Sequence, residues 1–286
     1  MEPTPLERAP ASLAGDRDVW LKREDVHELG AFKWRGALPT LRGWRTDVVT
    51  ASTGNHGAAS AWAAKQLGLK ATVFVPERAS ATKLALLERW GADLRQVGAD
   101  FDEAKDAARV FADERGLPFF EDGAEAMQYE GYSAIGREIA AELDDATVVV
   151  PVGNGALLIG IARGLADGMR CVGVVAAAAP VMADSWRAGH VVDSPYEESI
   201  ADGLAVRIAI PSAVTELRAA ADEMLAVTEL ELMRGVAAFH SAGIRAEASA
   251  AAALAALPHL EADGPIVLIV TGRNIDDDLL ARCLAA

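Results

Sequence analysis

A lysine with unusual neighbours is the residue best suited to chemistry in this chain. Lys33 lies between Phe32 and Trp34, within residues 31–37 (AFKWRGA). Burial among aromatic rings favours the neutral amine of a lysine, which is its nucleophilic form. Further along, residues 52–57 (STGNHG) form a polar loop that opens a helix, and backbone N–H groups at such a position bind anions. Together these segments could hold an aldehyde as a Schiff base and grip a carboxylate.

The other lysines lie in segments that indicate solvent exposure or a structural role. The chain has six lysines, and none lies beyond residue 105. Lys22 alternates with Leu21 in a strand-like run, and four more lie among polar residues of helix-like segments. Lys33 is therefore the candidate nucleophile; the alternative is an exposed lysine on the first turn of a helix. The four surface candidates are Lys65, Lys70, Lys83 and Lys105.

Two further motifs follow apolar, strand-like runs. Residues 150–157 (VPVGNGAL) end a strand in a glycine-rich turn that opens a helix, a pattern that predicts a phosphate-binding loop. No Lys-Ser/Thr pair follows, which argues against a nucleoside triphosphate loop, and a third glycine at dinucleotide spacing is missing, so NAD is a poor alternative. The second motif is 271–274 (TGRN), directly after the apolar run 266–270.

Short apolar runs that alternate with helix-like segments must position these motifs. The alternation predicts an α/β fold whose parallel sheets are covered by helices on both faces. Ser80 and Asp100 are predicted N-caps. Predicted strands are 48–50, 71–75, 94–97, 147–150, 171–175, 224–227 and 266–270, and a short strand begins at 119–120. Predicted helices are 58–67, 80–90, 101–115, 157–166, 228–243, 248–257 and 276–284.

Composition excludes several classes of partner. The 286 residues carry a formal net charge of −15, which argues against nucleic acid and anionic membrane surfaces as partners. No apolar run reaches the roughly 18 residues of a membrane span, and no signal peptide is predicted. The two cysteines, Cys171 and Cys283, fit a reducing cytoplasm. The five histidines show no metal-ligand spacing, so no metal is expected.

The four motifs, in this order, resemble the fold-type II pyridoxal-phosphate enzymes, and within them the serine/threonine dehydratases. The resemblance implies two doubly wound, mostly parallel α/β domains. The small one, residues 47–128, would be nested in a large one made of residues 1–46 and 129–286. It also implies pyridoxal 5'-phosphate as the cofactor, a small amino acid as the substrate and a homodimer as the assembly.

The resemblance implies a role for each motif. Lys33 would hold the cofactor as a Schiff base and then take the α-proton of the substrate as general base. Asn55 would contact the phenolic oxygen of the cofactor, and Thr271 its pyridine nitrogen. Glu247 and Arg273 are possible further site residues, and residues 201–206 (ADGLAV) resemble a dehydratase segment. The substrate loop would be Ser52, Thr53, Gly54, Asn55 and His56. The phosphate loop would be Gly153, Asn154, Gly155, Ala156 and Leu157.

The function that the resemblance implies is an ammonia-lyase acting on L-threonine or L-serine. A hydroxyl at Thr271 leaves the pyridine nitrogen mostly unprotonated, which favours elimination of a β-leaving group. Racemases of the family carry a serine at the position of Thr53, so serine racemisation stays open, with Thr53 as a catalytic candidate. β-Replacement also stays open, although His56 argues against it. Asn154 and Ala156, which replace family glycines, and Arg273 keep a non-catalytic cofactor-binding protein open.

A cation site is not expected. Related racemases and some dehydratases have an acidic residue soon after the strand that corresponds to 171–175. Here residues 176–179 are alanines, so the oxygen ligand that a hard cation needs is missing. Asp184 is the nearest carboxylate in the sequence.

Overall fold

The computed structural model describes residues 2–286, which form two compact units. One consists of the chain up to Ala31 together with Tyr132–Ala286, and the other is Phe32–Gly131. The second unit begins at Phe32 and so includes a helix, α2 (Trp34–Trp44), that the sequence analysis assigned to the large domain. The predicted domain boundaries at 46/47 and 128/129 stay a prediction.

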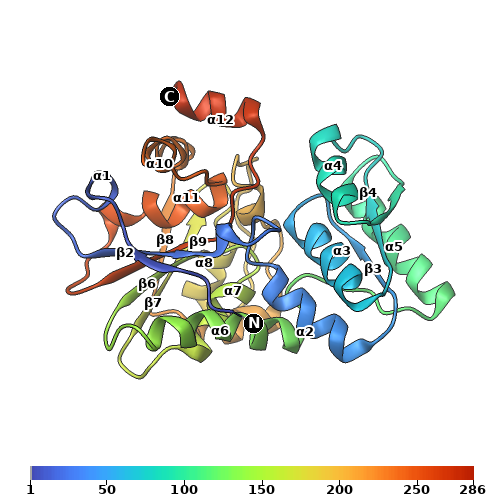
Figure 1. The fold of residues 1–286 in the computed structure, drawn as a ribbon, viewed down its shortest axis with the longest axis horizontal. Helices are drawn as coiled ribbons and strands as arrows, with labels where there is room; N and C mark the ends of the chain where they lie inside the picture. The colour runs from blue at the N-terminus through green and yellow to red at the C-terminus, as the bar shows by residue number, and fades with distance from the viewer. Residues whose placement is uncertain (1) are drawn as a thin grey trace. The chain divides into compact units, whose positions relative to one another are not determined.

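Strands and helices alternate along most of the chain, as the fold class predicted from the sequence requires (Figure 1). The strands are β1 (Leu6–Arg8), β2 (Val19–Arg23), β3 (Val48–Ala51), β4 (Ala71–Val75), β5 (Asp93–Gln96), β6 (Thr147–Pro151), β7 (Arg170–Ala176), β8 (Glu223–Val227) and β9 (Ile266–Val270). The helices are α1 (Ala11–Ala14), α2, α3 (Asn55–Leu67), α4 (Ala81–Arg89), α5 (Phe101–Arg115), α6 (Ala126–Ala140), α7 (Ala156–Gly164), α8 (Val181–Ala188), α9 (Pro211–Ala220), α10 (Glu229–Ser241), α11 (Ala248–Ala255) and α12 (Asp277–Leu284). Short 3₁₀ helices are η1 (Glu24–Val26), η2 (Asp202–Leu204) and η3 (Leu257–His259).

The larger unit is built on a mostly parallel sheet. Among the described residues its strand order is β1-β2-β9-β6-β7-β8, and only the edge strand β1 runs antiparallel to its neighbour. Leu268 in the central strand β9 pairs with Leu21 on one side and Val149 on the other. The carboxyl ends of β6 and β9 therefore lie side by side, and the two motifs that follow these strands leave the sheet at the same edge.

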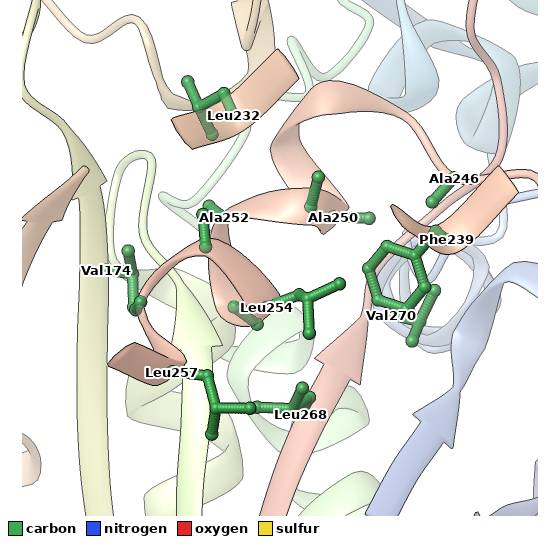
Figure 2. Close-up of a cluster of buried hydrophobic side chains, with 14 of the residues drawn as sticks. Val174, Leu232, Phe239, Ala246, Ala250, Ala252, Leu254, Leu257, Leu268 and Val270 are labelled. Carbon is green, nitrogen blue, oxygen red and sulfur yellow. The ribbon is translucent and has the colours of Figure 1, made fainter. Parts of the chain in front are cut away.

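Helices cover both faces of this sheet. Val172 and Val174 of β7 pack in the cluster beneath α11, whereas a Cβ at the intervening Gly173 would lie 3.0 Å from Leu158 of α7. Successive residues of a strand point to opposite faces, so α11 and α7 lie on opposite sides. Figure 2 shows the α11 side, where Leu254 lies among side chains of the sheet and of α10. The alanines of α11 let these layers approach closely.

The smaller unit contains a parallel sheet of order β3-β4-β5 within the described chain. Its core joins Val49 and Phe74 to the alanines of α5. The expected strand at 119–120 is reduced to a single parallel bridge between Phe119 and Val49. The bridge still matters, because it brings the residues after Phe120 to the carboxyl end of β3.

Helix boundaries follow local signals in most places. The side chains of Ser80 and Asp100 accept from the backbone N–H groups of Lys83 and Glu103, which confirms both predicted N-caps. Two helices begin earlier than predicted: α3 at Asn55 and α7 at Ala156. Five of the described α-helices are absent from the sequence prediction: α1, α2, α6, α8 and α9.

The described residues contain neither a membrane-spanning helix nor a cluster of metal ligands. Between residues 2 and 286, no helix is both long and apolar enough to cross a membrane. No group of three or more His, Cys, Asp and Glu side chains in that range could hold a metal ion. Asp184 instead pairs with Arg187 at 3.0 Å and accepts from the Ser194 hydroxyl at 2.7 Å.

Candidate active site

Lys33 lies at the start of a helix and is paired with a carboxylate. It is the residue before α2, and its side chain is 15% exposed. Its Nζ donates to both carboxylate oxygens of Asp122, at 2.6 and 2.9 Å, and lies 5.0 Å from the centre of the Phe32 ring. The sequence analysis identified the aromatic neighbours of Lys33 but not this carboxylate, which comes from a part of the chain far from Lys33 in the sequence.

Asp122 is the main site residue that sequence reasoning missed. Burial would raise the pKa of its carboxyl, but Lys33 and His56 outweigh this and hold the pKa at about 2. The carboxylate is therefore ionised at neutral pH. A signal was present, because Asp122 comes two residues after Phe120, at the end of a strand-like run, where polar residues commonly line a site.

The loop at residues 52–57 is built to leave backbone N–H groups at a helix start. The Ser52 N–H donates to the Phe74 carbonyl at 3.2 Å, and the Ser52 hydroxyl accepts from the Gly54 N–H at 3.2 Å. Gly54 precedes α3 and provides no side-chain cap. A Cβ on Gly57 would lie 2.7 Å from the Ser52 carbonyl oxygen, so the turn needs glycine there. The N-terminus of α3 can thus attract a carboxylate.

The remaining loop side chains differ in exposure. Thr53 and Asn55 are half-buried, whereas His56 is buried. The Nε2 of His56 lies 3.1 Å from the Phe120 carbonyl oxygen and its Nδ1 lies 3.4 Å from Asp122. Burial, and then the nearby Lys33 charge, lower the pKa of His56 although Asp122 opposes them. The neutral imidazole is therefore favoured at pH 7.

In the larger unit, the predicted phosphate loop, residues 153–157, is a tight turn with a hydrogen bond between two of its own residues. Gly155 has a φ of +91°, which glycine tolerates. A Cβ on Gly153 would overlap the carbonyl oxygen of Gly203, in the segment that resembles dehydratases. The Asn154 side chain accepts from the Ala156 N–H at 3.1 Å. One of the loop's N–H donors is thus already engaged, a consequence of the substitution of glycine by asparagine.

Thr271 follows β9 and carries an unsatisfied polar atom. Its Oγ1 is buried and has no hydrogen-bond partner in the described part of the chain. The next residue, Gly272, accepts from the Glu247 N–H at 3.0 Å, and a Cβ on Gly272 would lie 2.7 Å from the Glu247 carboxylate. A buried hydroxyl without a partner is costly, so this atom is suited to a ligand that supplies an acceptor.

Arg273 is directed to a neighbouring loop. Its guanidinium donates to the backbone carbonyl of Asp25, and its backbone N–H donates to the Gly30 carbonyl at 2.8 Å. The Asn274 side chain donates to the Leu29 carbonyl at 3.0 Å. The departure from the family pattern at 273 therefore ties the 271–274 turn to residues 25–30.

These residues fit pyridoxal 5'-phosphate. The cofactor needs an amine for its aldehyde, backbone donors for its phosphate and a partner for its ring nitrogen. Lys33 offers the amine, the turn before α7 is a loop that a Cβ would fill, and the Thr271 hydroxyl lacks a partner among residues 2–286. Ser52–His56 and Lys33 belong to one unit, and Gly153–Leu157, Glu247 and Thr271 belong to the other.

Comparisons with known proteins agree with this fit. A family model described as pyridoxal-phosphate dependent enzyme matches residues 1–272. An L-threonine ammonia-lyase from Geobacter sulfurreducens is 34% identical over 271 residues, covering 90% of this chain and 67% of that protein. The structure of processed threonine deaminase isoform 2 from Solanum lycopersicum superposes with a TM-score of 0.91 at 27% identity, covering 99% and 82% of the two chains. Maize serine racemase shares the fold: it superposes with a TM-score of 0.89 at 24% identity, covering 99% of this chain and 91% of that one.

Proposed function

Because the chain belongs to the family of pyridoxal-phosphate-dependent enzymes, we propose that it is an ammonia-lyase. The reaction converts L-threonine or L-serine to a 2-oxo acid and ammonia. The observation that carries this proposal is the buried hydroxyl of Thr271 after β9, which has no hydrogen-bond partner among residues 2–286. A hydroxyl does not protonate the cofactor's pyridine nitrogen as a carboxylic acid would. The ring is then a weaker electron sink, which favours rapid loss of a β-hydroxyl over a long-lived carbanion.

Two relatives support this choice of reaction. The relative from Geobacter sulfurreducens is named an L-threonine ammonia-lyase, and a second protein of that name, from Thermotoga maritima, is 30% identical over 279 residues. The likeness to racemases rests on fold. The substrate proposed here is therefore a small β-hydroxy amino acid.

Each motif has a proposed part in holding the cofactor and substrate. Lys33 would bind the cofactor aldehyde, the turn Gly153–Leu157 its phosphate and Thr271 its ring nitrogen. Asn55 would orient the cofactor ring, and Glu247 would support the turn after Thr271. The N–H groups of Ser52–His56 would bind the substrate carboxylate.

The chain's own groups then move the protons. Bound pyridoxal phosphate supplies the electron sink for the pair left at the substrate α-carbon. Lys33 Nζ takes the α-proton as general base. The β-hydroxyl would leave as water with a proton equivalent to the one that Lys33 removes from the α-carbon, and the unsaturated amine that is released would hydrolyse to the 2-oxo acid and ammonia. Thr53, half-buried at the loop, stays a candidate for proton transfer at the opposite face.

Release of 2-oxo acid from L-threonine and L-serine by the purified protein with pyridoxal phosphate tests this proposal. Release from either substrate supports the lyase, and the ratio of the two rates names the preferred substrate. Enantiomer exchange without 2-oxo acid would instead establish a racemase. Turnover only after a second nucleophile is added would establish β-replacement. Cofactor binding without any turnover would establish a non-catalytic protein.

The proposal extends to the cell and the assembly. We propose a cytoplasmic homodimer. Both cysteines, Cys171 and Cys283, are free and buried, which fits a reducing compartment. The family resemblance supports the dimer, and sedimentation at several protein concentrations tests it.

Thr271→Val is expected to separate cofactor binding from stability. In the cofactor-free protein, removal of an unsatisfied buried hydroxyl should be neutral or stabilising by up to about 1 kcal/mol. Affinity for pyridoxal phosphate should fall roughly tenfold, since a hydrogen bond is lost. Thr271→Ser, which keeps the hydroxyl, is the control for affinity. A Thr271→Val protein that unfolds earlier yet binds the cofactor normally would show that the hydroxyl serves the fold.

Asn154→Gly is expected to strengthen cofactor binding. The change frees the Ala156 N–H from the Asn154 side chain, and one additional hydrogen bond to phosphate corresponds to a threefold to tenfold tighter Kd, or about 1 kcal/mol. Titration of the cofactor-free protein with pyridoxal phosphate measures the change. Asn154→Asp keeps the acceptor and adds a negative charge, so it should weaken binding. Weaker binding in both variants would contradict this account.

A further inference from the structure

One carboxylate oxygen in the unit Phe32–Gly131 is shared by three side chains. Asp122 Oδ1 lies 2.9 Å from Lys33 Nζ, 3.2 Å from Gln128 Nε2 and 3.4 Å from His56 Nδ1. The lysine and the histidine can each exchange a proton, whereas the glutamine amide cannot. Asp122 therefore links two titratable nitrogens through a single atom.

Backbone groups orient both neutral partners of this carboxylate. Gln128 Oε1 accepts from the Gly123 N–H at 2.9 Å, so the amide nitrogen must face Asp122. His56 Nε2 lies 3.1 Å from the Phe120 carbonyl oxygen, which can only accept. Nε2 thus carries a proton, and Nδ1, toward Asp122, is the nitrogen that can gain or lose one.

The contacts of Asp122 with Lys33 and His56 suit a lysine that must lose and regain a proton during its function. Lys33 must lose a proton before its nitrogen can attack a carbonyl carbon or take an α-proton. We propose that Asp122 conducts this proton from Lys33 Nζ to His56 Nδ1, where it is stored while Lys33 is neutral. One N–H bond breaks at Nζ and one forms at Nδ1, and the carboxylate is ionised before and after. The total charge of the three groups is unchanged, and the proton returns by the same route.

The protonation states of the two nitrogens are electrostatically coupled. The ammonium of Lys33 is one of the influences that lower the pKa of His56, and Asp122 is the main influence that raises it. Loss of the lysine proton removes this influence of Lys33, while burial, the largest influence, still lowers the pKa of His56 and Asp122 still raises it. His56 therefore gains proton affinity as Lys33 loses its proton, as expected for coupled titrations.

Glu121 is the other charged group that acts on the His56 ring. Its carboxylate is paired with Lys105 at 2.6 Å and Arg109 at 2.9 Å. These two cations offset the charge of Glu121, whereas Asp122 is the carboxylate that contacts both Lys33 and His56. The inference rests on the proposed role of Lys33, and it makes Asp122 and His56 positioning residues that act through it.

The test measures the protonation of His56 directly. Histidine-labelled full-length protein, freed of cofactor, is titrated by NMR, with His56→Gln to identify the signal. Lys33→Met removes the lysine charge, and Lys33→Arg is the matched control that keeps it. We expect the His56 titration midpoint to move to higher pH in Lys33→Met and to stay near the wild-type value in Lys33→Arg. In Asp122→Asn it should move to lower pH.

The NMR signal of a second histidine, His259, serves as an internal reference that detects misfolding of a variant. His259 pairs with Glu231 at 2.6 Å in the other unit, so its NMR signal at a given pH should be the same in all variants. Equal His56 midpoints in Lys33→Met and Lys33→Arg would overturn the proposal, as would an unchanged midpoint in Asp122→Asn. Neither result depends on substrate turnover. If the protein shows these shifts but releases no 2-oxo acid, the relay is supported and the proposed ammonia-lyase reaction is contradicted.

A second readout follows the loading of the holoenzyme. In His56→Gln, the amide can still donate to the Phe120 carbonyl but cannot store a proton. The rate at which the cofactor-free protein takes up pyridoxal phosphate near neutral pH should fall roughly a hundredfold, with a changed pH profile. A reduced rate with the wild-type pH profile would indicate a structural role for His56 and contradict the relay.

Discussion

Lys33→Ala is expected to abolish release of 2-oxo acid from L-threonine, lowering the rate by at least about 10⁴-fold. The substitution removes both the amine that holds the cofactor and the base that takes the α-proton. A coupled assay for the 2-oxo acid measures the loss, and the absorption band of the lysine-bound cofactor should disappear with it. Loss of the Lys33 cation should not unfold the protein, because the Asp122 side chain is 31% exposed and water can solvate its carboxylate.

Lys65→Ala is the matched control for this prediction. Lys65 lies on the same unit, in α3, and is exposed. Its removal should leave both the activity and the absorption band unchanged. A Lys33→Ala protein that still released 2-oxo acid would show that another group performs the proton transfer.

Lys22→Met is expected to have the largest effect on stability. Lys22 Nζ is buried in β2, 2.5 Å from Glu138 Oε2 and 2.6 Å from the Thr4 carbonyl oxygen. Removal of the cation leaves a carboxylate that is only 15% exposed without it. Breaking a buried pair in this way costs about 3–5 kcal/mol. The Lys22→Met protein should therefore unfold at a clearly lower temperature and a lower urea concentration than the wild type.

The double variant Lys22→Met, Glu138→Leu distinguishes an uncompensated charge from lost packing. Removal of both ions should restore much of the stability, because replacing both members of a buried ion pair by apolar side chains costs less than removing one of them. Arg8→Met is the control, since the Arg8–Asp18 pair on the neighbouring strand is exposed at 68% and 37%, and such pairs contribute at most about 1 kcal/mol. A Lys22→Met protein as stable as Arg8→Met would contradict the prediction.

Glycines explain why one long helix escaped sequence prediction. Helix α6 contains Gly131 and Gly136, and glycine lowers the helix propensity of any segment. In the structure each glycine lies where a Cβ would overlap a backbone carbonyl oxygen, that of Arg35 for Gly131 and that of Ile161 for Gly136. Close packing of α6 against these backbone carbonyls thus requires glycine at two positions, although glycine has a low helix propensity.

The sequence by itself determined the α/β class and the residue types of the candidate site. Apolar runs, N-caps such as Ser80 and Asp100, and glycine-rich turns are local signals, because a few neighbouring residues set the backbone there. Lys33 could be singled out in the same way, from its aromatic neighbours and from the polar surroundings of the other lysines.

Only the tertiary structure decided what surrounds those residues. The pairing of Lys33 with Asp122 joins positions 89 residues apart, and that of Lys22 with Glu138 joins positions 116 apart. The approach of Gly203 to Gly153 is likewise a contact between separate segments. No local preference encodes such contacts, because they form only when the fold of each unit brings segments that are distant in the sequence together. The electrostatics of Lys33 therefore emerge from the fold, whereas its identity as a candidate comes from the sequence.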